Sequence, residues 1–468
     1  MSFKHLLKVG LLLASSINTL AGSIYEMNGR EYNIATVFNR DISIIGGGSA
    51  GTYSAVRLQD LGKSVLIIEK GGRLGGNTET YHDPVSKVSI DYGVRVWHKF
   101  PEVYNYFECL NVSLINTTFA QPGVSTQYFD FNTGIVNASY PPQNIIDGIP
   151  AASQAYGLQA VKYSYLDDGY NLPSPVPEDL LLPFADFGKK YSLEAFMYLL
   201  WRQTQGIGNF LQTPALYVLK YCGLSYLQGL QTGFVTTATG DNSLLYESAE
   251  RVLDGSVVYN SSILDMKRYP GGVQIVLNTP AGQVLVQSKK LVIAIQPQLD
   301  GMQGIDLSAE EQRLFGQFKS NEYFAGILKN TGIPDNVTSV VIDSSQPYSI
   351  PETPNLYSIQ QTGVPGFQSV TYISTTDTTN DEIQQTILDG IKRLRTRDTT
   401  LEPEFVAASI HKPFQLTVSH DTIENGFYDD LYALQGQLNT WYTSATFQTH
   451  DSSLIWRFTE TLLPDIAA

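Results

Sequence analysis

The most informative hydrophobic pattern in this sequence lies between Asp41 and Gly76. A short, mostly apolar run, Ile42–Ile45, leads directly into three consecutive glycines, and a helical pattern follows over residues 50–62. A second run, Ser64–Ile68, ends at an acidic residue. Short apolar runs that end at turns predict buried parallel strands, and the segment between them has the period of a helix. The pattern therefore predicts a strand–turn–helix–strand unit of an α/β fold.

The glycine turn of this unit has the spacing of a dinucleotide-binding loop. Gly46, Gly48 and Gly51 form a G-x-G-x-x-G pattern. The first glycine permits the tight turn, the second lets the backbone approach a pyrophosphate, and the third lets the helix pack against the strand. The first helical residues, Ser49 and Ala50, are expected to present their amides to the phosphates. The turn therefore predicts a phosphate site made mostly of backbone.

An acidic residue and a second glycine-rich loop follow. Glu69 stands about 20 residues after the turn, where an acid accepts a hydrogen bond from a ribose hydroxyl, and a glycine turn of purely structural use would not explain it. In the loop 73–76 the backbone can lie along the phosphates while the arginine offsets their charge. Such a loop after the acid is typical of one class of FAD-binding proteins, so FAD is the predicted cofactor. The contacts predicted in this segment are Glu69, Lys70, Arg73, Gly75 and Gly76.

Together the turn 46–51, Glu69, the loop 73–76 and the segment Asp91-Tyr92-Gly93 resemble the flavin-containing amine oxidase superfamily. With the C-terminal stretch 431–464, they look more closely like its β-cyclopiazonate dehydrogenase-like branch. That branch comprises secreted or lumenal FAD oxidoreductases of fungal secondary metabolism. The sequence is therefore expected to share the fold and the cofactor of that branch.

The resemblance implies an α/β fold in two parts. It is strong over residues 39–100, fair over 234–300 and 415–468, and faint elsewhere. The expected parts are a discontinuous Rossmann-type, GR2-like FAD-binding domain and an α+β substrate-binding domain. The first is expected to comprise residues 39–100, 234–300 and 415–468, and the second residues 101–233 and 301–414.

Later apolar runs predict further strands of the FAD-binding domain. Runs between residues 257 and 288 are separated by Pro- and Gly-containing turns, which is the pattern of strands joined by hairpins. Residues 291–297 read as another buried parallel strand that ends at a proline. Thr440–Phe447 alternates as a strand would, and a helical pattern follows to the end of the chain.

By the resemblance, the backbone of Val257 and Val258 would lie against the adenine. The last helix would point its N-terminus at the flavin, near Ser452, where reduction builds negative charge. The usual Ala-Gly-Glu of the superfamily is absent before this helix, and residues 444–446 (Ser-Ala-Thr) stand near that place. The departure leaves the individual flavin contacts in this region open.

Two histidines are candidates for the reacting centre. His98 lies on the segment that resembles the flavin-facing strand and loop. It is either a flavin contact, with a covalent 8α-linkage as one form, or a partly buried histidine that caps a loop. His450 either caps the last helix or donates toward the flavin or the substrate.

The sequence allows more than one role for other side chains near these histidines. Arg95 either holds an acidic group of the substrate or pairs with Asp91. Aromatic residues can form an apolar wall beside the flavin ring, although protein cores use them equally. The candidates for the wall are Tyr92, Trp97 and Trp441, and His82, His411 and His420 are expected to be structural or on the surface.

The charge and composition of the chain limit the classes of partner that it is expected to bind. Hydrophobic residues make up 43% and charged residues 16% of the 468 residues, as in folded globular proteins, and the formal net charge is −15. An acidic surface argues against nucleic acid and anionic membranes as partners. The sequence contains no run of about 20 apolar residues for a stable membrane span and no metal-ligand spacing. A small-molecule substrate is therefore the expected partner, and the oligomeric state stays open.

The N-terminus predicts a secretory signal peptide over residues 1–22. Lys4 and Lys8 precede an apolar run, and small residues near Ala21 and Gly22 suit a signal peptidase. The alternative is an amphipathic leader that stays attached. Five sequons favour a secreted or lumenal glycoprotein, at Asn111, Asn116, Asn137, Asn260 and Asn336.

Two cysteines, Cys109 and Cys222, are compatible with a disulfide in an oxidising compartment or with two thiols. No Cys-x-x-Cys occurs, which excludes a redox dithiol of the thioredoxin type. A second G-x-G-x-x-G with its own acid is also absent, so reduction of the flavin by a nicotinamide cofactor is not expected.

These features predict an FAD-dependent oxidoreductase that removes a hydride from an apolar small molecule, which can contain nitrogen. Oxygen or another acceptor would reoxidise the flavin. One alternative is a flavin-dependent double-bond isomerase without net redox change. Another is a flavin-binding protein without catalytic activity.

Overall fold

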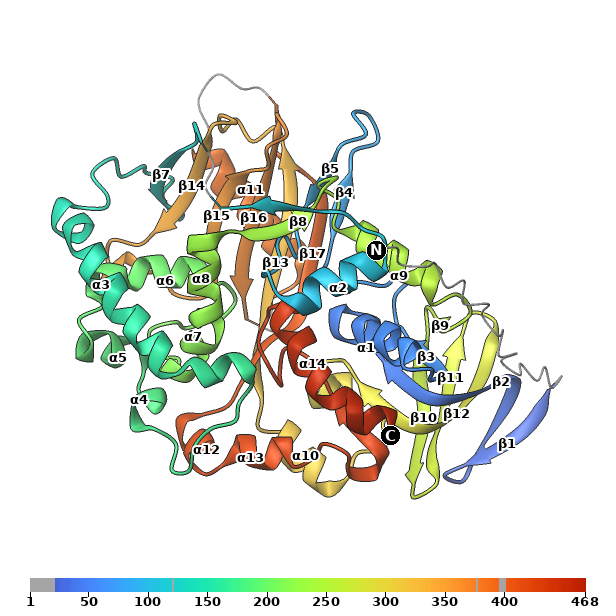
Figure 1. The fold of residues 1–468 in the computed structure, drawn as a ribbon. Coiled ribbons are helices and arrows are strands. Elements are labelled where there is room, and N and C mark those ends of the chain that lie inside the picture. Colours follow the sequence, from blue (N-terminus) through green and yellow to red (C-terminus); the bar gives the residue numbers. More distant parts are fainter. Residues whose placement is uncertain (1–21, 120–121, 376–377, 395–400) are drawn as a thin grey trace, which may run out of the picture.

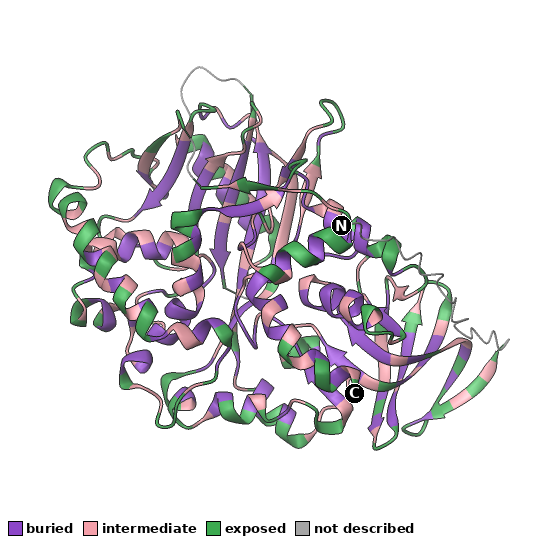
Figure 2. Ribbon diagram, viewed as in Figure 1, coloured by how far each residue is buried: buried purple, intermediate pink, exposed green. Residues whose placement is uncertain are grey.

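Two large β-sheets organise the molecule, whose structure is a computed structural model (Figure 1). The structure describes residues 22–119, 122–375, 378–394 and 401–468. All but the last residue of the predicted signal peptide therefore lie outside the described residues. In Figure 2 the buried residues follow both sheets and the helix faces that cover them.

The first sheet has eight strands and contains the predicted dinucleotide unit. Five of them, β18, β12, β2, β3 and β9, pair in parallel, while β10, β11 and β12 form an antiparallel meander and β1 pairs antiparallel with β2. The strands are β1 (Ser23–Met27), β2 (Arg30–Ile45), β3 (Val65–Ile68), β9 (Val257–Val258), β10 (Ser262–Tyr269), β11 (Gly272–Thr279), β12 (Gly282–Ile293) and β18 (Thr440–Tyr442).

Helices from distant parts of the chain pack beside this sheet (Figure 1). Trp456 of the last helix stacks on Tyr53 of the first, with ring centroids 5.2 Å apart and planes 6° from parallel. Because both side chains are buried, this contact joins the two ends of the chain in one core. The helices are α1 (Ser49–Asp60), α2 (Pro101–Cys109), α9 (Ser243–Val252) and α14 (Ser452–Ala467).

The second sheet has six strands in the order β17-β13-β16-β15-β14-β7. Its pairs are antiparallel except for β14 with β7. The strands are β7 (Ser125–Asp130), β13 (Lys319–Lys329), β14 (Val337–Ile342), β15 (Asn355–Gln361), β16 (Phe367–Ser374) and β17 (Glu404–Thr417). Two antiparallel two-stranded sheets lie outside the large sheets: β4 (Thr80–His82) with β5 (Ser89–Asp91), and β6 (Leu114–Thr117) with β8 (Phe234–Thr237).

The other helices lie beside this second sheet or along the lower edge of the molecule in Figure 1. None of the helices in the described ranges is both long and apolar enough to cross a membrane. These helices are α3 (Gln143–Lys162), α4 (Glu178–Leu181), α5 (Phe184–Lys190), α6 (Met197–Gln203), α7 (Ala215–Tyr221), α8 (Leu224–Thr232), α10 (Ala309–Phe315), α11 (Asn380–Leu394), α12 (His420–Glu424) and α13 (Phe427–Tyr432).

Three strands differ from the sequence-based expectation. The first predicted strand is the end of β2, which begins at Arg30 because β1 and β12 supply partners along its whole length. Residues 291–293 continue β12 rather than forming a separate strand. The alternating segment Thr440–Phe447 is a strand only to Tyr442, because its partner β12 ends at Ile293 and leaves the later residues without a ladder.

Candidate functional site

The N-termini of α1 and α14 meet at one point. The hydroxyl of Ser49 donates a 2.8 Å hydrogen bond to the hydroxyl of Ser452, and the indole of Trp456 donates a 3.0 Å bond to Ser49. Each helix N-terminus carries a partial positive charge and unpaired amides. The structure therefore places two anion-attracting helix ends side by side, where the sequence predicted phosphate and flavin contacts.

The glycine turn before α1 is shaped by close backbone contacts. Gly46 has a φ of +96°, in the left-handed region, and a Cβ on Gly51 would lie 1.9 Å from the carbonyl oxygen of Gly46. A Cβ on Gly48 would meet nothing closer than 3.9 Å, the Cα of Gly76. Gly51 is thus required by the fold itself, whereas nothing in the protein crowds Gly48. The first turn of α1 carries no acidic residue that would repel an anion.

Glu69 is held at the edge of the parallel strands. Its carboxylate accepts hydrogen bonds from the amides of Gly47, at 2.7 Å, and Gly71, at 2.6 Å. Its own amide donates to the carbonyl of Val258 on β9, so Val257 and Val258 lie beside the acid. The contact of these two residues with the adenine stays a prediction. Lys70 is exposed next to it. A carboxylate fixed by two amides is preorganised to accept further bonds from a sugar.

The loop 73–76 lies directly against the glycine turn. The amide of Gly75 donates to the carbonyl of Gly47 at 2.8 Å, and a Cβ on Gly76 would lie 3.0 Å from the Cα of Gly48. Arg73 donates to the carbonyls of Leu74, Gly76 and Thr78, at 2.9–3.1 Å, so its guanidinium fixes the loop. A direct contact between Arg73 and a phosphate stays a prediction.

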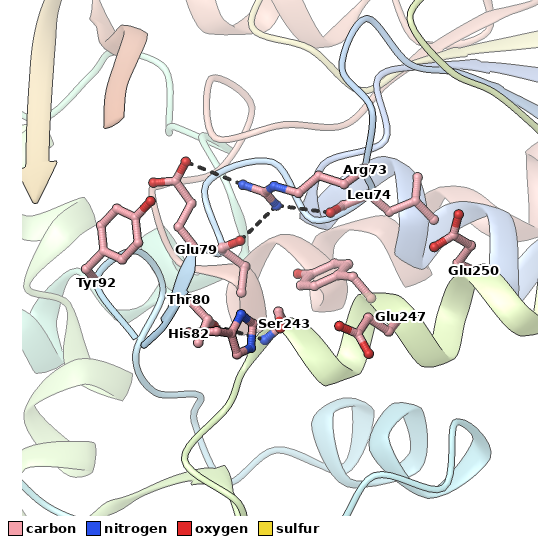
Figure 3. Close-up of a pocket in the computed structure, with 11 residues that line it drawn as sticks. Arg73, Leu74, Glu79, Thr80, His82, Tyr92, Ser243, Glu247 and Glu250 are labelled. Atoms are coloured by element: carbon pink, nitrogen blue, oxygen red, sulfur yellow. Dashed lines mark hydrogen bonds and ion pairs between the residues drawn. The ribbon is translucent and has the colours of Figure 1, made fainter. Parts of the chain in front are cut away.

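A cavity of about 370 Å³ opens behind this loop (Figure 3). Arg73, Glu79, Tyr92 and His82 line it together with the start of α9. The hydroxyls of Thr78 and Tyr246, which also line it, are buried; they lie near each other, and that of Tyr246 near Ser49, without a hydrogen bond of normal geometry. Buried hydroxyls without partners are costly, and a bound group with acceptor oxygens would satisfy them. Together with the open space at Gly48, these hydroxyls fit the diphosphate of FAD.

His98 is buried and faces the cap of the last helix. Its Nε2 lies 3.0 Å from an oxygen of Asp451, and its amide donates to the hydroxyl of Ser453 at 2.9 Å. Asp451 caps α14 by accepting from the amides of Ser453 and Leu454. Burial alone would lower the pKa of His98, but the Asp451 carboxylate outweighs it, so the net pKa is raised. The contact at the N-terminus of α14 is therefore an ion pair when His98 is protonated. The flavin contact proposed for His98 stays a prediction.

His450 precedes this cap and contacts the second sheet. Its ring stacks on Phe414 of β17, with centroids 3.8 Å apart, and its Nε2 accepts a 2.9 Å bond from the amide of Gln415. Burial, with a smaller effect of His411, lowers the pKa of His450 to about 3. His450 is therefore neutral near pH 7, with Nε2 as an acceptor and Nδ1 left as the donor.

Trp97 and Trp441 do not form an exposed wall. Trp97 is 1% exposed and packs edge-on against Phe107 and near Trp456, because it lies in the core beside α2 and α14. Trp441 is 8% exposed and packs in the same core. Of the three predicted wall residues, Tyr92 lines the cavity behind the loop 73–76.

His411 has a role that the sequence did not indicate. On β17 it is 7% exposed, and its Nε2 lies 3.2 Å from the carboxylate of Glu79, which follows the glycine-rich loop. This contact ties the segment after the loop 73–76 to the second sheet. No sequence signal could have paired these two residues, because their proximity depends on how the sheets are placed. His82 pairs with Asp241 at 2.7 Å, and His420 is exposed.

The cysteines are two separate thiols in this structure, with Cys109 exposed and Cys222 buried. His420, Asp421 and Glu424 are the one group of potential metal ligands found among the described residues, with ligand atoms within 4.8 Å of one another. All three are exposed on a short helix, so the group supports no metal assignment.

Comparisons with known proteins agree with this geometry. Residues 44–110 match the model of an NAD(P)-binding Rossmann-like domain. The chain is 38% identical to the FAD-dependent oxidoreductase oblC of Cochliobolus heterostrophus over 98% of this chain and 97% of the relative. It is 33% identical to the beta-cyclopiazonate dehydrogenase of Aspergillus flavus over 97% of this chain and 98% of that one.

Solved structures share the fold at lower identity. A CLA-producing fatty acid isomerase from P. acnes superposes with a TM-score of 0.73 at 20% identity, over 91% of this chain and 98% of the other. A putrescine oxidase bound to putrescine superposes with a TM-score of 0.67 at 14% identity, over 92% and 99%. The fold, the glycine turn with its acid and the full-length relatives agree, and the chain therefore belongs to the family of FAD-dependent oxidoreductases that includes beta-cyclopiazonate dehydrogenase.

Proposed function

We propose that this FAD-dependent oxidoreductase oxidises or desaturates an apolar small molecule, which can contain nitrogen, in fungal secondary metabolism. The observation that carries the proposal is the contact between His450 and Phe414, which brings the N-terminus of α14 against the second sheet. A substrate held on that sheet would lie beside the group bound at the helix N-terminus. Bound FAD supplies the acceptor for the hydride that the substrate loses.

The residues around this contact suit an apolar substrate. Tyr323 of β13 stacks on Phe414 with ring centroids 4.9 Å apart, and its hydroxyl donates to Gln205 at 2.7 Å. Aromatic faces bind unsaturated and ring-shaped molecules by dispersion and exclude water from them. The chain would contribute binding, orientation and a dry surface, and neutral His450 can donate one hydrogen bond from Nδ1.

The names of relatives agree with small organic substrates. Beta-cyclopiazonate dehydrogenase is named for the oxidation of beta-cyclopiazonate, and putrescine oxidase for that of an amine. The substrate of this chain is proposed at the level of chemical class only.

We also propose that the protein is secreted or lumenal and glycosylated. The first described strand begins at Ser23, directly after the predicted cleavage site. Four sequon asparagines are exposed and the fifth is half-buried, so all are within reach of a transferase. The exposed ones are Asn111, Asn116, Asn260 and Asn336, and the half-buried one is Asn137.

The proposal is tested with the protein secreted from a fungal host. The purified protein is expected to carry FAD, and a substrate found in a panel of cyclic and unsaturated small molecules should bleach the flavin without oxygen. Oxygen or an artificial acceptor should then be consumed in proportion to product. Conversion without any consumption would instead identify a double-bond isomerase, and FAD that no compound bleaches would favour a flavin-binding protein without activity.

A further inference from the structure

One carboxylate, that of Glu79, contacts both the glycine-rich loop 73–76 and the second sheet. Its Oε1 lies 3.4 Å from the guanidinium of Arg73, a contact drawn in Figure 3, and its Oε2 lies 3.2 Å from Nε2 of His411 on β17. The side chains of Glu79 and His411 are 13% and 6% exposed, whereas that of Arg73 is 52% exposed. The carboxylate is therefore shared between a buried histidine of the second sheet and a cation that solvent reaches.

The neighbours of Glu79 keep it ionised. Burial alone would raise the pKa of Glu79, but the hydrogen bond and the charge of His411 outweigh burial, with smaller effects of Ser409 and Arg73, so the net pKa is lowered. Glu79 therefore carries its negative charge near neutral pH. A carboxylate with two donors divides its attraction between them, so the loss of one donor strengthens its attraction for the other.

Arg73 is the residue through which Glu79 acts on the loop 73–76. Its guanidinium donates to three backbone carbonyls of its own segment at 2.9–3.1 Å, and the loop that these bonds fix lies against the glycine turn. At 3.4 Å, its contact with Glu79 is the longest of the four. While His411 engages the carboxylate, the guanidinium therefore serves mainly the loop, and a stronger attraction from Glu79 would draw it away from those carbonyls.

The strand that carries His411 also reaches the other end of the predicted cofactor site. Further along β17, Phe414 stacks on His450 with ring centroids 3.8 Å apart, and the amide of Gln415 donates to Nε2 of His450 at 2.9 Å. His450 stands directly before Asp451, the cap of α14. One strand of the second sheet therefore contacts the segment after the loop 73–76 and also the residue before the cap of the last helix.

We propose that His411 is a positioning residue for FAD: by engaging the carboxylate of Glu79 it leaves Arg73 free to fix the loop 73–76, so that β17 helps to keep the cofactor bound. The inference concerns the retention of FAD and goes beyond the proposed function, because it does not depend on the substrate. In this role His411 acts on FAD only through Glu79. Substitutions of the two residues must therefore be non-additive in their effect on FAD affinity.

The test is a double-mutant cycle on the full-length protein with FAD as the probe. His411→Asn removes the bond to Glu79 because the shorter amide does not reach the position of Nε2, Glu79→Gln removes the charge, and a third variant carries both changes. His411→Gln, whose longer amide can donate in place of Nε2, is the conservative variant. His420→Asn, at an exposed histidine that pairs with Asp421, is the matched control.

Fluorescence titration of the apoproteins gives the FAD dissociation constants, and thermal unfolding of the same apoproteins reports on the fold. His411→Asn should weaken FAD binding by about 5- to 10-fold, the size expected when hydrogen bonds of a charged group are disturbed. In the Glu79→Gln background the same substitution should change the dissociation constant by less than about twofold, because no carboxylate then attracts Arg73. His411→Gln should keep most of the wild-type affinity, and His420→Asn all of it.

Two results would overturn the inference. Equal losses of FAD affinity from His411→Asn in both backgrounds would show that His411 acts independently of Glu79. An unchanged affinity together with a lower melting temperature would show that the contact serves the fold alone. Should His411→Asn fail to fold, the cycle is run with His411→Phe, which keeps a ring beside Phe414. Neither overturning result would touch the proposed function, whereas a wild-type protein that binds no FAD would overturn both.

Discussion

Ser49 and Ser452 lie 2.8 Å apart through their hydroxyls, although they open the first and the last helix of the chain. The contact brings two helix N-termini to one place, so that one anionic cofactor can use both. It also means that the C-terminal segment lies at the predicted cofactor site. The predictions below test separate parts of this arrangement.

Replacing Gly48 and Gly51 by alanine should have different effects. A Cβ at Gly48 meets no protein atom within 3.9 Å, whereas a Cβ at Gly51 would lie 1.9 Å from a carbonyl oxygen. Gly48→Ala should therefore keep the melting temperature of the apoprotein and weaken FAD binding, because only the cofactor comes close. Gly51→Ala should lower both. Thermal unfolding of the apoproteins and FAD titration measure the two effects; equal melting losses would contradict the assignment.

Glu69→Gln should weaken FAD binding by about 10-fold or more, because a charged acceptor for the ribose is lost. The side-chain carbonyl of the new glutamine can still accept a hydrogen bond from the backbone N–H of Gly47 or of Gly71, which both donate to the Glu69 carboxylate. The fold should therefore change little. FAD dissociation constants from fluorescence titration provide the measurement, with Glu31→Gln, at an exposed position, as the control.

The His98–Asp451 pair should make stability depend on pH. The pKa of His98 is raised in the folded state, so its contribution is fully present below the unfolded value of about 6.5 and is lost as the pH rises through the folded value. The pKa of Asp451 is lowered, so its contribution is present above about 3.9 and is lost as the pH falls through the folded value. Denaturant unfolding of wild type and His98→Gln at pH 5–9 measures the difference, which should shrink at the alkaline end.

Asp451→Ala should destabilise the protein by about 1 kcal/mol or more through loss of the helix cap. In the wild type, the Asp451 carboxylate accepts hydrogen bonds from the backbone amides of Ser453 and Leu454 and also faces His98. Asp451→Asn should retain the cap and lose only the charge. Urea unfolding of both variants separates the two contributions, and equal losses would show that the cap contributes nothing.

His450 should not titrate within the working range. Its pKa is lowered to about 3, so the ring is neutral from pH 5 to pH 9. The rate of flavin reduction in His450→Gln should therefore differ from the wild type by a constant factor over that range. Stopped-flow measurements give the rate of flavin reduction at each pH. A bend in the pH profile of the wild type that His450→Gln lacks would show that His450 acts as a base near neutrality.

Thiol labelling should distinguish the two cysteines. Cys109 is exposed, although burial raises the pKa of its thiol, and Cys222 is fully enclosed. The native protein should therefore react slowly at one thiol, and the denatured protein at two. Cys109→Ser should abolish the native reaction. No free thiol after denaturation without a reductant would indicate a disulfide instead.

The sequence by itself determined the parts of the site that are local. The strand, the glycine turn, the helix and Glu69 lie within about 30 consecutive residues, and each residue type is required by a specific backbone conformation or bond. The resemblance to relatives extended this to the cofactor and to the later segments of the same sheet. It also predicted that the last helix would reach the flavin, and the structure brings that helix to α1.

Only the tertiary structure decided contacts between distant residues. The alternation of residues 440–447 predicted a strand, but the end of β12 at Ile293 stops the pairing. Trp97 reads equally as a pocket wall or as core, and packing against Trp456 makes it core. Asp91 is near Arg95 in the sequence, and one oxygen of its carboxylate accepts bonds from Thr80 and from Asn242, which is far away in the sequence. Local patterns encode the conformation of a segment, whereas a partner depends on which segments the two sheets bring together.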